Sequence, residues 1–359
     1  MIFTINKTDL QVAIAAPARL AAKSLSAHTS CVLVVADADQ VTFEATDQTE
    51  SARCSQIALI EQPGRTLIPA NSLSSIIKTL PDEAVTISSD GSTAHIECGM
   101  ASFDIPALSP NDFPGFPSVD ASDSVTVPFE LFASMAKAAY PFAAKKTEAR
   151  DNLKGVYIEY DGAGCLMMTA TDSYHIIRVV ERSNDISGSG GFSALVPSAF
   201  MAASASAKFA SEAVLSVSDK QVQVTCGNTT LITRTINERY PSVDQFFNCE
   251  QNARAEFIRD ELLGTIKRAV AVSSRDHIAI KIYDGHLDVS LCSSDRGSMH
   301  ECLDVATDGM CTASLGSAFL LDALSAIDSD TAEVILENPL KPIILKGAST
   351  SCVVMPIRK

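Results

Sequence analysis

At 359 residues the chain is long enough for two or three domains, each with its own core. Hydrophobic residues make up 46% of the chain and charged residues 20%, which excludes wholesale disorder. The formal net charge of −15 argues against tight, non-specific binding of nucleic acid over the whole surface. The first ten residues do not resemble a signal peptide, and no apolar run is long enough to cross a membrane. We therefore expect a cytoplasmic protein without membrane contact.

The chain opens on a short strand and a helix, and this pair of elements recurs twice. Apolar residues at helical spacing mark the three helices: Leu10 and Ile14, Leu131 and Met135, Leu262 and Ile266. Pro17 lies in the first of these segments, and proline removes a hydrogen bond of the helix. We therefore expect the first helix to end or kink at Pro17.

Two strands around an acidic turn follow each of these helices. The segments are F-E-A-T-D-Q-T-E-S-A-R (43–53), M-M-T-A-T-D-S-Y-H-I-I-R (167–178) and V-S-L-C-S-S-D-R-G-S-M-H-E-C (289–302). Each alternates in polarity on both sides of an aspartate, which is the pattern of a β-hairpin. Asp47, Asp172 and Asp295 are thus predicted to be equivalent turn residues whose carboxylates accept backbone N–H groups.

Each unit ends with a strand, a second helix and paired strands. The strand and helix are T-L-I-P-A-N-S-L-S-S-I-I-K-T-L, A-L-V-P-S-A-F-M-A-A-S-A-S-A-K-F and A-S-L-G-S-A-F-L-L-D-A-L-S-A-I. Units one and two close on N-D-F-P-G-F-P and N-E-R-Y-P-S-V. The repetition predicts an α+β protein of three similar domains, with ranges 1–121, 122–251 and 252–359. The G-S-G-G run at 188–191 then falls inside the second domain, as an internal loop.

Basic residues recur on the side of the opening helices away from the core. They are Arg19 and Lys23 in the first unit, Lys137, Lys145, Lys146 and Arg150 in the second, and Lys267 and Arg268 in the third. A solvated helix face explains any single helix of this kind. Three equivalent helices favour a shared surface that attracts a phosphate backbone weakly and without reading sequence.

The residues Asp172, Ser173 and His175 could instead form a catalytic cluster. The sequence contains no phosphate-binding loop, dinucleotide fingerprint, nucleophile elbow or zinc-protease motif, and no close histidine ligand set. The ten cysteines form no C-x-x-C pair and are typical of reduced, buried side chains. The first and third units keep the aspartate without the histidine. We therefore expect a structural turn, no metal, no cofactor and no enzyme.

The order of these units, the T-D turns, the D-F-P and R-Y-P motifs and the terminal V-V-M-P-I-R together resemble one family. It is the family of bacterial sliding clamps, the beta subunit of DNA polymerase III. The resemblance covers the full length of the chain. It implies the DNA clamp fold and a head-to-tail homodimer whose six domains form a ring around duplex DNA. Such a ring tethers the polymerase and confers processivity; an ATP-driven clamp loader places it on DNA.

The resemblance also implies a pocket between the second and third domains that binds linear motifs of partner proteins, including the DNA polymerase III alpha subunit, the clamp loader and repair proteins. Its residues in this chain would be Leu153, Thr171, Ser173, His175, Ile176, Pro241, Leu340, Pro342, Val353, Val354, Met355, Pro356 and Arg358. DNA would contact Lys23, Lys146 and Arg150. Phe103 and Ile105 would meet Val272 of a second subunit.

This chain departs from the family where T-D-S-Y-H-I replaces the frequent T-D-G-H-R-L. Ser173 stands for a glycine and His175 for an arginine, which changes the depth and charge of that wall. Two other functions stay open on the sequence alone. One is a repeat scaffold that never encircles DNA, and the other is a hydrolase using Asp172 and His175.

Overall fold

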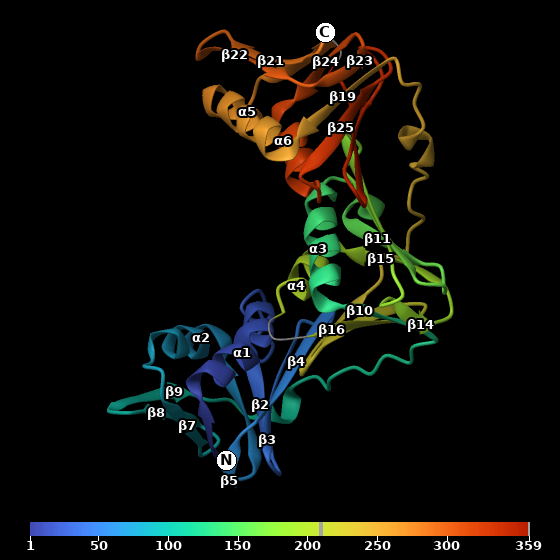
Figure 1. Cartoon of the computed structure of the whole chain (residues 1–359). Coiled ribbons are helices and arrows are strands. Elements are labelled where there is room, and N and C mark those ends of the chain that lie inside the picture. Colours follow the sequence, from blue (N-terminus) through green and yellow to red (C-terminus); the bar gives the residue numbers. More distant parts are fainter. Residues whose placement is uncertain (208–210, 358–359) are drawn as a thin grey trace. The chain divides into compact units, whose positions relative to one another are not determined.

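A computed structural model describes residues 1–207 and 211–357 (Figure 1). Its helices and strands follow the same order three times along the chain, and we call each of these three repeats a copy. Each copy runs strand, helix, four strands, strand, helix and three strands. The first copy comprises β1 (Ile2–Asn6), α1 (Lys7–Ala21), β2 (Cys31–Asp37), β3 (Gln40–Thr46), β4 (Glu50–Ile57), β5 (Leu59–Gln62), β6 (Gly64–Pro69), α2 (Ala70–Thr79), β7 (Ala84–Ser89), β8 (Thr93–Cys98) and β9 (Ala101–Pro106). The α+β repeat expected from the sequence is confirmed.

The second and third copies repeat this order, with short 3-10 helices added. The second comprises β10 (Asp123–Pro128), α3 (Phe129–Ala139), β11 (Gly155–Tyr160), β12 (Cys165–Thr171), β13 (His175–Arg182), β14 (Ser187–Ser189), β15 (Phe192–Pro197), α4 (Ser198–Ser204), β16 (Glu212–Val217), β17 (Gln221–Cys226) and β18 (Thr229–Arg234). The third comprises β19 (Ala253–Ile258), α5 (Arg259–Val272), β20 (His277–Tyr283), β21 (His286–Ser293), β22 (Gly297–Asp304), β23 (Ala306–Gly309), β24 (Cys311–Gly316), α6 (Ser317–Ala326), β25 (Thr331–Leu336), β26 (Ile343–Lys346) and β27 (Thr350–Val354). The 3-10 helices are η1 (Pro110–Asp112), η2 (Tyr140–Phe142), η3 (Asp151–Leu153) and η4 (Asp244–Phe247).

Two of the four sheets join strands of different copies. The first nine-stranded sheet has the order β14-β10-β16-β17-β18-β4-β3-β2-β6, and the second has the order β15-β11-β12-β13-β27-β26-β25-β19-β23. The pair β18–β4 links copies one and two, and the pair β13–β27 links copies two and three. The two smaller sheets have the orders β5-β1-β7-β8-β9 and β22-β21-β20-β24.

The compact units of the structure therefore differ from the copies. One unit contains Met1–Phe132, Ser187–Gly190 and Ala203–Thr235, and the other contains Ala133–Ile186, Gly191–Ala202 and Ile236–Lys359. The middle copy is divided, because each of its two sheets continues into a neighbouring copy. None of the helices in the described residues is long and apolar enough to span a membrane.

The local elements form as the apolar pattern predicts, with two exceptions. The first helix does not end at Pro17, so that part of the prediction was wrong: α1 continues four residues further, to Ala21. Leu20 and Ala21 are buried there, and their burial offsets the hydrogen bond that Pro17 cannot make. The assignment of the G-S-G-G run as a loop was wrong for its first half: Gly188 and Ser189 belong to β14 and pair with β10, whereas Gly190 and Gly191 lie outside a strand. A Cβ on Gly188 would lie 2.1 Å from the carbonyl oxygen of Ser124, so only glycine permits this approach.

All ten cysteines are free thiols, but not all are buried. Six are buried, in line with their apolar surroundings in the sequence, and Cys165 and Cys249 are half-buried. Cys292 and Cys302 are exposed, which corrects the expectation for these two. Cys292 follows the buried Leu291 on β21, and Cys302 lies between the half-buried Glu301 and Leu303 on β22, so the alternation of each strand turns both thiols to its more exposed face.

Candidate functional site

The turn between β12 and β13 is fixed by the carboxylate of Asp172. Its Oδ1 accepts the backbone N–H groups of Tyr174 at 2.8 Å and His175 at 3.0 Å. Thr171 Oγ1 donates to the carbonyl oxygen of His175 at 2.8 Å and accepts the N–H of Ser173 at 3.1 Å. Ser173 has φ +79°, a conformation that glycine adopts without strain. This explains why glycine suits the position, and the serine costs about 1 kcal/mol there.

The first copy builds the same turn with different side chains. Asp47 Oδ1 accepts the N–H groups of Thr49 at 2.9 Å and Glu50 at 2.7 Å. Thr46 Oγ1 bonds the carbonyl oxygen of Glu50 and the N–H of Gln48, whose φ is +72°. Asp47 and Asp172 are thus equivalent turn residues, as the sequence predicted.

The third copy does not repeat the turn in which an aspartate accepts two backbone N–H groups. Asp295 Oδ1 accepts the hydroxyl of Ser293 at 2.9 Å. The sheet pairing places Ser293, and not Asp295, at the position of Asp172, since Leu291 pairs with Met299 as Ala170 pairs with Ile177. The equivalence of Asp295 was therefore wrong: the third hairpin has a longer loop and the aspartate lies further along it.

The imidazole of His175 is held in a sandwich of aromatic rings. Its centroid lies 4.3 Å from that of Phe142 and 4.9 Å from that of Phe319, and the residue is 3% exposed. Nδ1 lies 2.7 Å from Asp172 Oδ1. Burial raises the pKa of Asp172, but the hydrogen bonds from His175 and the backbone outweigh it and leave the pKa below its ordinary value. Asp172 is therefore an ionised acceptor, and Nδ1 is the donor.

This geometry does not support the hydrolase. A serine triad requires a hydroxyl at the free ring nitrogen. The Nε2 atom of His175 is buried without a hydrogen-bond partner among the described residues, and Asp322 Oδ2 lies 3.8 Å away. Ser173 is exposed in the turn itself. No cluster of three or more metal-ligating side chains occurs within residues 1–207 and 211–357.

The residues predicted for the peptide pocket differ widely in exposure. Thr171, His175, Ile176, Val353 and Val354 are buried; Leu153, Pro241, Pro342, Met355 and Pro356 are half-buried; Ser173 and Leu340 are exposed. Arg358 lies outside the described residues. The half-buried and exposed members offer the surface that a ligand could contact directly.

The pair β13–β27 brings one part of this set together. Ile176 is opposite Val353, and His175 is opposite Val354. The N–H of Met355 donates to the carbonyl oxygen of Tyr174 at 2.9 Å. Ile176 and Val353 share an apolar cluster with Val243, Ile335 and Ile344, and Met355 packs against it. Leu153, Pro241, Leu340 and Pro342 are not members of this cluster.

The aromatic residues in and just after R-Y-P were not predicted to belong to the site. Tyr240, Phe246 and Phe247 pack against the apolar cluster of Ile176 and Val353. Tyr240 also stacks on Tyr157 at 4.9 Å, and the guanidinium of Arg178 lies over the ring of Phe247 at 4.4 Å. The run Y-P-S-V-D-Q-F-F carried the signal, since such apolar density is unusual in a connecting segment.

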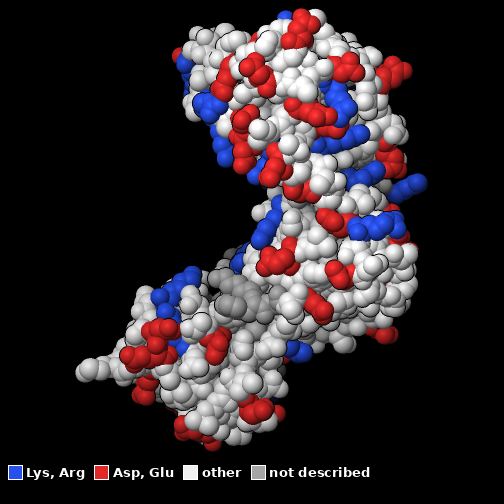
Figure 2. Space-filling view, in the orientation of Figure 1, with Lys and Arg blue, Asp and Glu red and all other residues white. Residues whose placement is uncertain are grey.

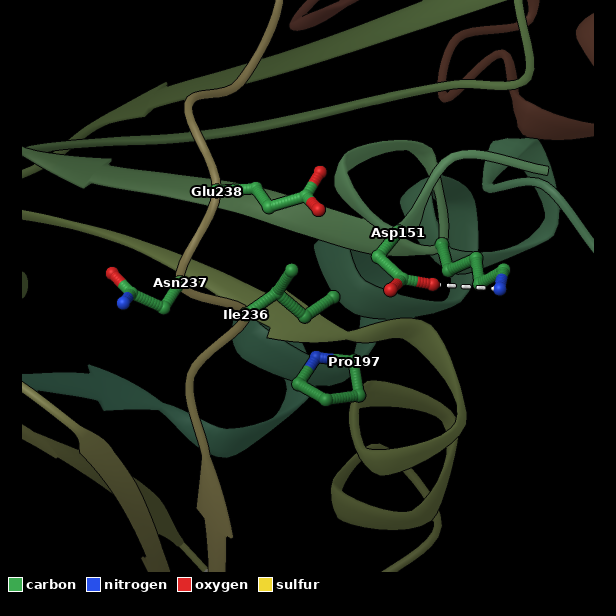
Figure 3. Close-up of a pocket in the computed structure, with 6 residues that line it drawn as sticks. Asp151, Pro197, Ile236, Asn237 and Glu238 are labelled. Atoms are coloured by element: carbon green, nitrogen blue, oxygen red, sulfur yellow. Dashed lines mark hydrogen bonds and ion pairs between the residues drawn. The ribbon is translucent and has the colours of Figure 1, made fainter.

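A pocket of about 490 Å³ adjoins η3, the short helix that contains Leu153 (Figure 3). Its lining residues are Asp151, Lys154, Pro197, Ile236, Asn237 and Glu238. Lys154 Nζ pairs with Asp151 at 2.7 Å, and Glu238 Oε2 accepts the N–H of Asn152 at 3.2 Å. Its charged groups are thus largely paired with their neighbours, and the sequence reasoning predicted none of its lining residues.

The predicted DNA contacts Lys23, Lys146 and Arg150 are all exposed. Lys23 lies two residues after the end of α1, and the other two lie between η2 and η3 rather than on a helix. Arg268 on α5 pairs with Glu301, which neutralises part of the positive charge expected there. Figure 2 shows Lys and Arg side chains over the helices of the N-terminal unit and over α5.

The predicted dimer residues lie on an edge strand and on a helix that packs on another edge strand. Phe103 and Ile105 are half-buried on β9, the last strand of the five-stranded sheet. Val272 is the last residue of α5 and is half-buried. That helix packs on β22, the last strand of the four-stranded sheet.

Comparison with known proteins agrees with the repeated architecture. The DNA polymerase III beta subunit family matches in three parts: its N-terminal domain at residues 1–117, its central domain at 120–242 and its C-terminal domain at 245–358. The beta sliding clamp of Streptomyces coelicolor is 28% identical over 328 residues, covering 88% of this chain and 85% of that protein. The beta sliding clamp of Chlamydia pneumoniae is 26% identical over 336 residues, covering 91% and 90%.

Solved structures share the fold over the whole chain. The beta subunit of Streptococcus pyogenes DNA polymerase superposes with a TM-score of 0.91 at 20% identity, covering 100% of both chains. The DNA polymerase sliding clamp of Bacillus subtilis gives 0.89 at 20% identity, covering 100% of this chain and 99% of the other. Neither the hydrolase nor the non-encircling scaffold finds support in these relatives. With all three of its domains matched, the chain belongs to the DNA polymerase III beta subunit family, the non-catalytic sliding clamps of DNA replication.

Proposed function

We propose that this sliding clamp acts as a head-to-tail homodimer whose ring encircles duplex DNA and tethers a polymerase. The observation that carries the proposal is that two strands, β9 and β22, end their sheets, while equivalent strands are paired at the two internal joints. A second copy of the chain offers the missing partner for each. The three domains would be 1–121, 122–251 and 252–359, and the ring would act in the cytoplasm.

The two internal joints define how such strands pair. Leu231 of β18 lies opposite Ala52 of β4, and Cys352 of β27 lies opposite Ile177 of β13. Both pairs are buried and antiparallel. Leu231 and Cys352 thus occupy one position of the repeat, Ala52 and Ile177 occupy another, and these two positions face each other at both joints.

The repeat transfers this register to the intersubunit joint. In the first copy, Phe3 of β1 pairs with Ile87, Ile87 pairs with Ile96, and Ile96 pairs with Phe103 of β9. The same series of pairs in the second and third copies ends at Leu231 and Cys352, so Phe103 occupies their position. Met299 on β22 occupies that of Ala52 and Ile177. Phe103 should thus face Met299 of a second copy, with Ser102 opposite His300. Both proposed pairs match in exposure, since the first two side chains are half-buried and the second two exposed.

A disulfide tests this register. With Ser102→Cys and His300→Cys in one chain, oxidation should give a covalent dimer joined at both interfaces, because paired β residues lie within reach of a disulfide. Each single variant is the control, since Cys302 is also exposed and could react. A double variant that cross-links no better than the single variants would contradict the register.

Topological binding is the decisive test of the function. Clamp loaded onto nicked circular DNA should remain bound, and it should slide off once the circle is linearised. Lys23, Lys146 and Arg150 would then make weak, sequence-blind phosphate contacts, so that replacing all three lowers the yield of loaded clamp but not the escape from DNA ends. Retention on linear DNA would overturn the ring.

The pocket proposed for partner motifs includes Met355 and Pro356, which follow β27 directly. Polymerase alpha subunit, clamp loader and repair proteins would insert apolar anchors beside them. Removing residues 355–359 spares the strand pairs of β27 but breaks the backbone bonds from Met355 to Tyr174 and from Ile357 to Ser314. Loss of binding by a polymerase-derived peptide would therefore report on the pocket if urea unfolding of the truncated chain matches that of the full chain. Unchanged affinity in this truncated chain would place the pocket elsewhere.

A further inference from the structure

Two aromatic rings and a carboxylate form a corner beside the proposed pocket. Tyr174 is 59% exposed, and its ring stacks on Phe319 with centroids 5.6 Å apart and planes at 10°. Phe319 and Asp322 are three residues apart on α6, so both side chains lie on one face of the helix. We call Tyr174, Phe319 and Asp322 the acidic corner.

The acidic corner adjoins the proposed pocket through the backbone. The carbonyl oxygen of Tyr174 accepts the N–H of Met355, and Leu315, two residues before α6, pairs with Pro356. Gly316 lies under the ring of Phe319, since a Cβ there would approach it to 2.8 Å. The position of the aromatic pair is thus fixed by close packing rather than by chance contact.

The charge of Asp322 is not satisfied within the chain. In the described part of the protein, its one basic neighbour within 4 Å is His175, whose Nε2 lies 3.8 Å from Oδ2, beyond hydrogen-bond distance. His175 already donates Nδ1 to Asp172, and its buried Nε2 is left without a hydrogen-bond partner. Asp322 itself keeps 40% of its side chain exposed. A half-exposed carboxylate and an orphaned ring nitrogen therefore face one another.

A cationic side chain is the group that this surface fits. An exposed tyrosine ring attracts a cation over its face, and a carboxylate beside it adds an ion pair. Arginine fits better than lysine, because its planar guanidinium can stack on the ring and present two N–H groups to the carboxylate.

We infer that the acidic corner selects partner motifs that carry an arginine next to their apolar anchors. This inference rests on the proposed binding of partner peptides in the neighbouring pocket. It names Asp322 and Tyr174 as specificity-determining residues, neither of which was in the set predicted from the sequence.

Peptide binding with matched ligands tests the inference. A fluorescent polymerase-derived peptide with leucine and phenylalanine anchors is compared with versions that carry a single arginine, or a glutamine, at each flanking position. At one position we expect arginine to bind about three- to tenfold more tightly than glutamine. The preference should shrink in high salt, because the carboxylate is half-exposed.

Variants of the protein identify the residues responsible. Asp322→Asn should reduce the arginine preference to less than about twofold while leaving the glutamine peptide unaffected. Asp330→Asn removes the same charge from an exposed position just beyond α6 and should leave the preference intact. Tyr174→Leu should weaken the preference, and Tyr174→Phe should keep it.

The outcomes separate this inference from the function on which it rests. If the anchor peptides bind but arginine and glutamine versions bind equally, the acidic corner has no role in selection. Equal loss of preference in Asp322→Asn and Asp330→Asn would reduce the effect to net charge and overturn the inference. If no peptide binds to any variant, both the inference and the proposed pocket are wrong.

Discussion

The turns at Asp47 and Asp172 have the same backbone and opposite surroundings. In both, the aspartate accepts two backbone N–H groups and a threonine hydroxyl closes the loop. The residue three positions on is Glu50 in the first turn and His175 in the second. Glu50 lies near Asp47, Lys23 and Arg19, whereas His175 lies between two aromatic rings and two carboxylates.

The difference teaches how one repeated turn acquires two roles. A glutamate near the end of α1 is surrounded by charge, and its own pKa is raised by burial and by Asp47, although Lys23 and Arg19 oppose this. A histidine in the second turn instead donates to its aspartate and packs on α6. The first turn supports the proposed DNA face, and the second supports the proposed peptide pocket.

The largest expected difference is in the stability of the two turns when their variable residue is removed. His175→Ala deletes a buried ring between Phe142 and Phe319 and unpairs Asp172, so we expect a loss of about 2–4 kcal/mol. Glu50→Ala should cost less than about 0.5 kcal/mol, because the lost carboxylate was partly desolvated. Urea unfolding followed by tyrosine fluorescence measures both. Equal losses of unfolding free energy in the two variants would show that His175 and Glu50 do not make the two turns differ in stability.

The second comparison removes the charge of each aspartate. Asp172→Asn should cost about 1–2 kcal/mol, and Asp47→Asn less, because Asp172 also holds an imidazole. The pKa of Asp172 is lower in the folded chain, so its stabilisation is complete above its unfolded pKa and is lost as pH falls through the folded one. Unfolding measured across acid pH should therefore show the stabilities of the wild type and of Asp172→Asn converging as the pH falls below the ordinary pKa of aspartate. A gap that persists at the acid end of the series would assign the effect to packing instead.

The smallest expected effect is a gain in stability from Glu50→Gln. Burial raises the pKa of Glu50, so ionisation disfavours the folded chain as pH rises from the unfolded pKa through the folded one. The glutamine variant should be more stable by a few tenths of a kcal/mol at neutral pH, and equal below pH ~4. In a Lys23→Ala background, Glu50→Gln should raise the free energy of unfolding by more than it does in the wild type, because Lys23 no longer favours the ionised glutamate. A loss at neutral pH would mean that Lys23 and Arg19 outweigh burial.

The repeat itself was readable from the sequence because local patterns carry it. The alternating strands, the opening helices and the turns at Asp47 and Asp172 all depend on residues within a few positions of one another. The errors arose where a distant contact outweighed the local pattern. Gly188 forms an edge strand because β10 accepts it, and α1 continues past Pro17 because the core holds its last turn.

The candidate site was predicted in part, and the missing parts lie on other elements. Ile176, Val353 and Met355, which the family resemblance assigned to one pocket, share an apolar cluster in the structure. Tyr174, Phe319 and Asp322 were not predicted, because nothing near α6 in the sequence marks it as a neighbour of the turn at Asp172. Phe246 and Phe247 lie beyond the closing motif N-E-R-Y-P-S-V, and no feature of the sequence places them beside Ile176 and Val353.

The sequence by itself determined the order of elements, their three-fold repetition and the family. Those follow from short-range periodicity and from motifs that lie within each copy. The tertiary structure alone decided that β18 joins β4 and that β27 joins β13. It also decided that His175 is buried against Phe142 and Phe319 while Asp322 keeps half-exposed charge beside it. Strand edges and burial depend on partners far along the chain, and no local pattern encodes which partner will be met.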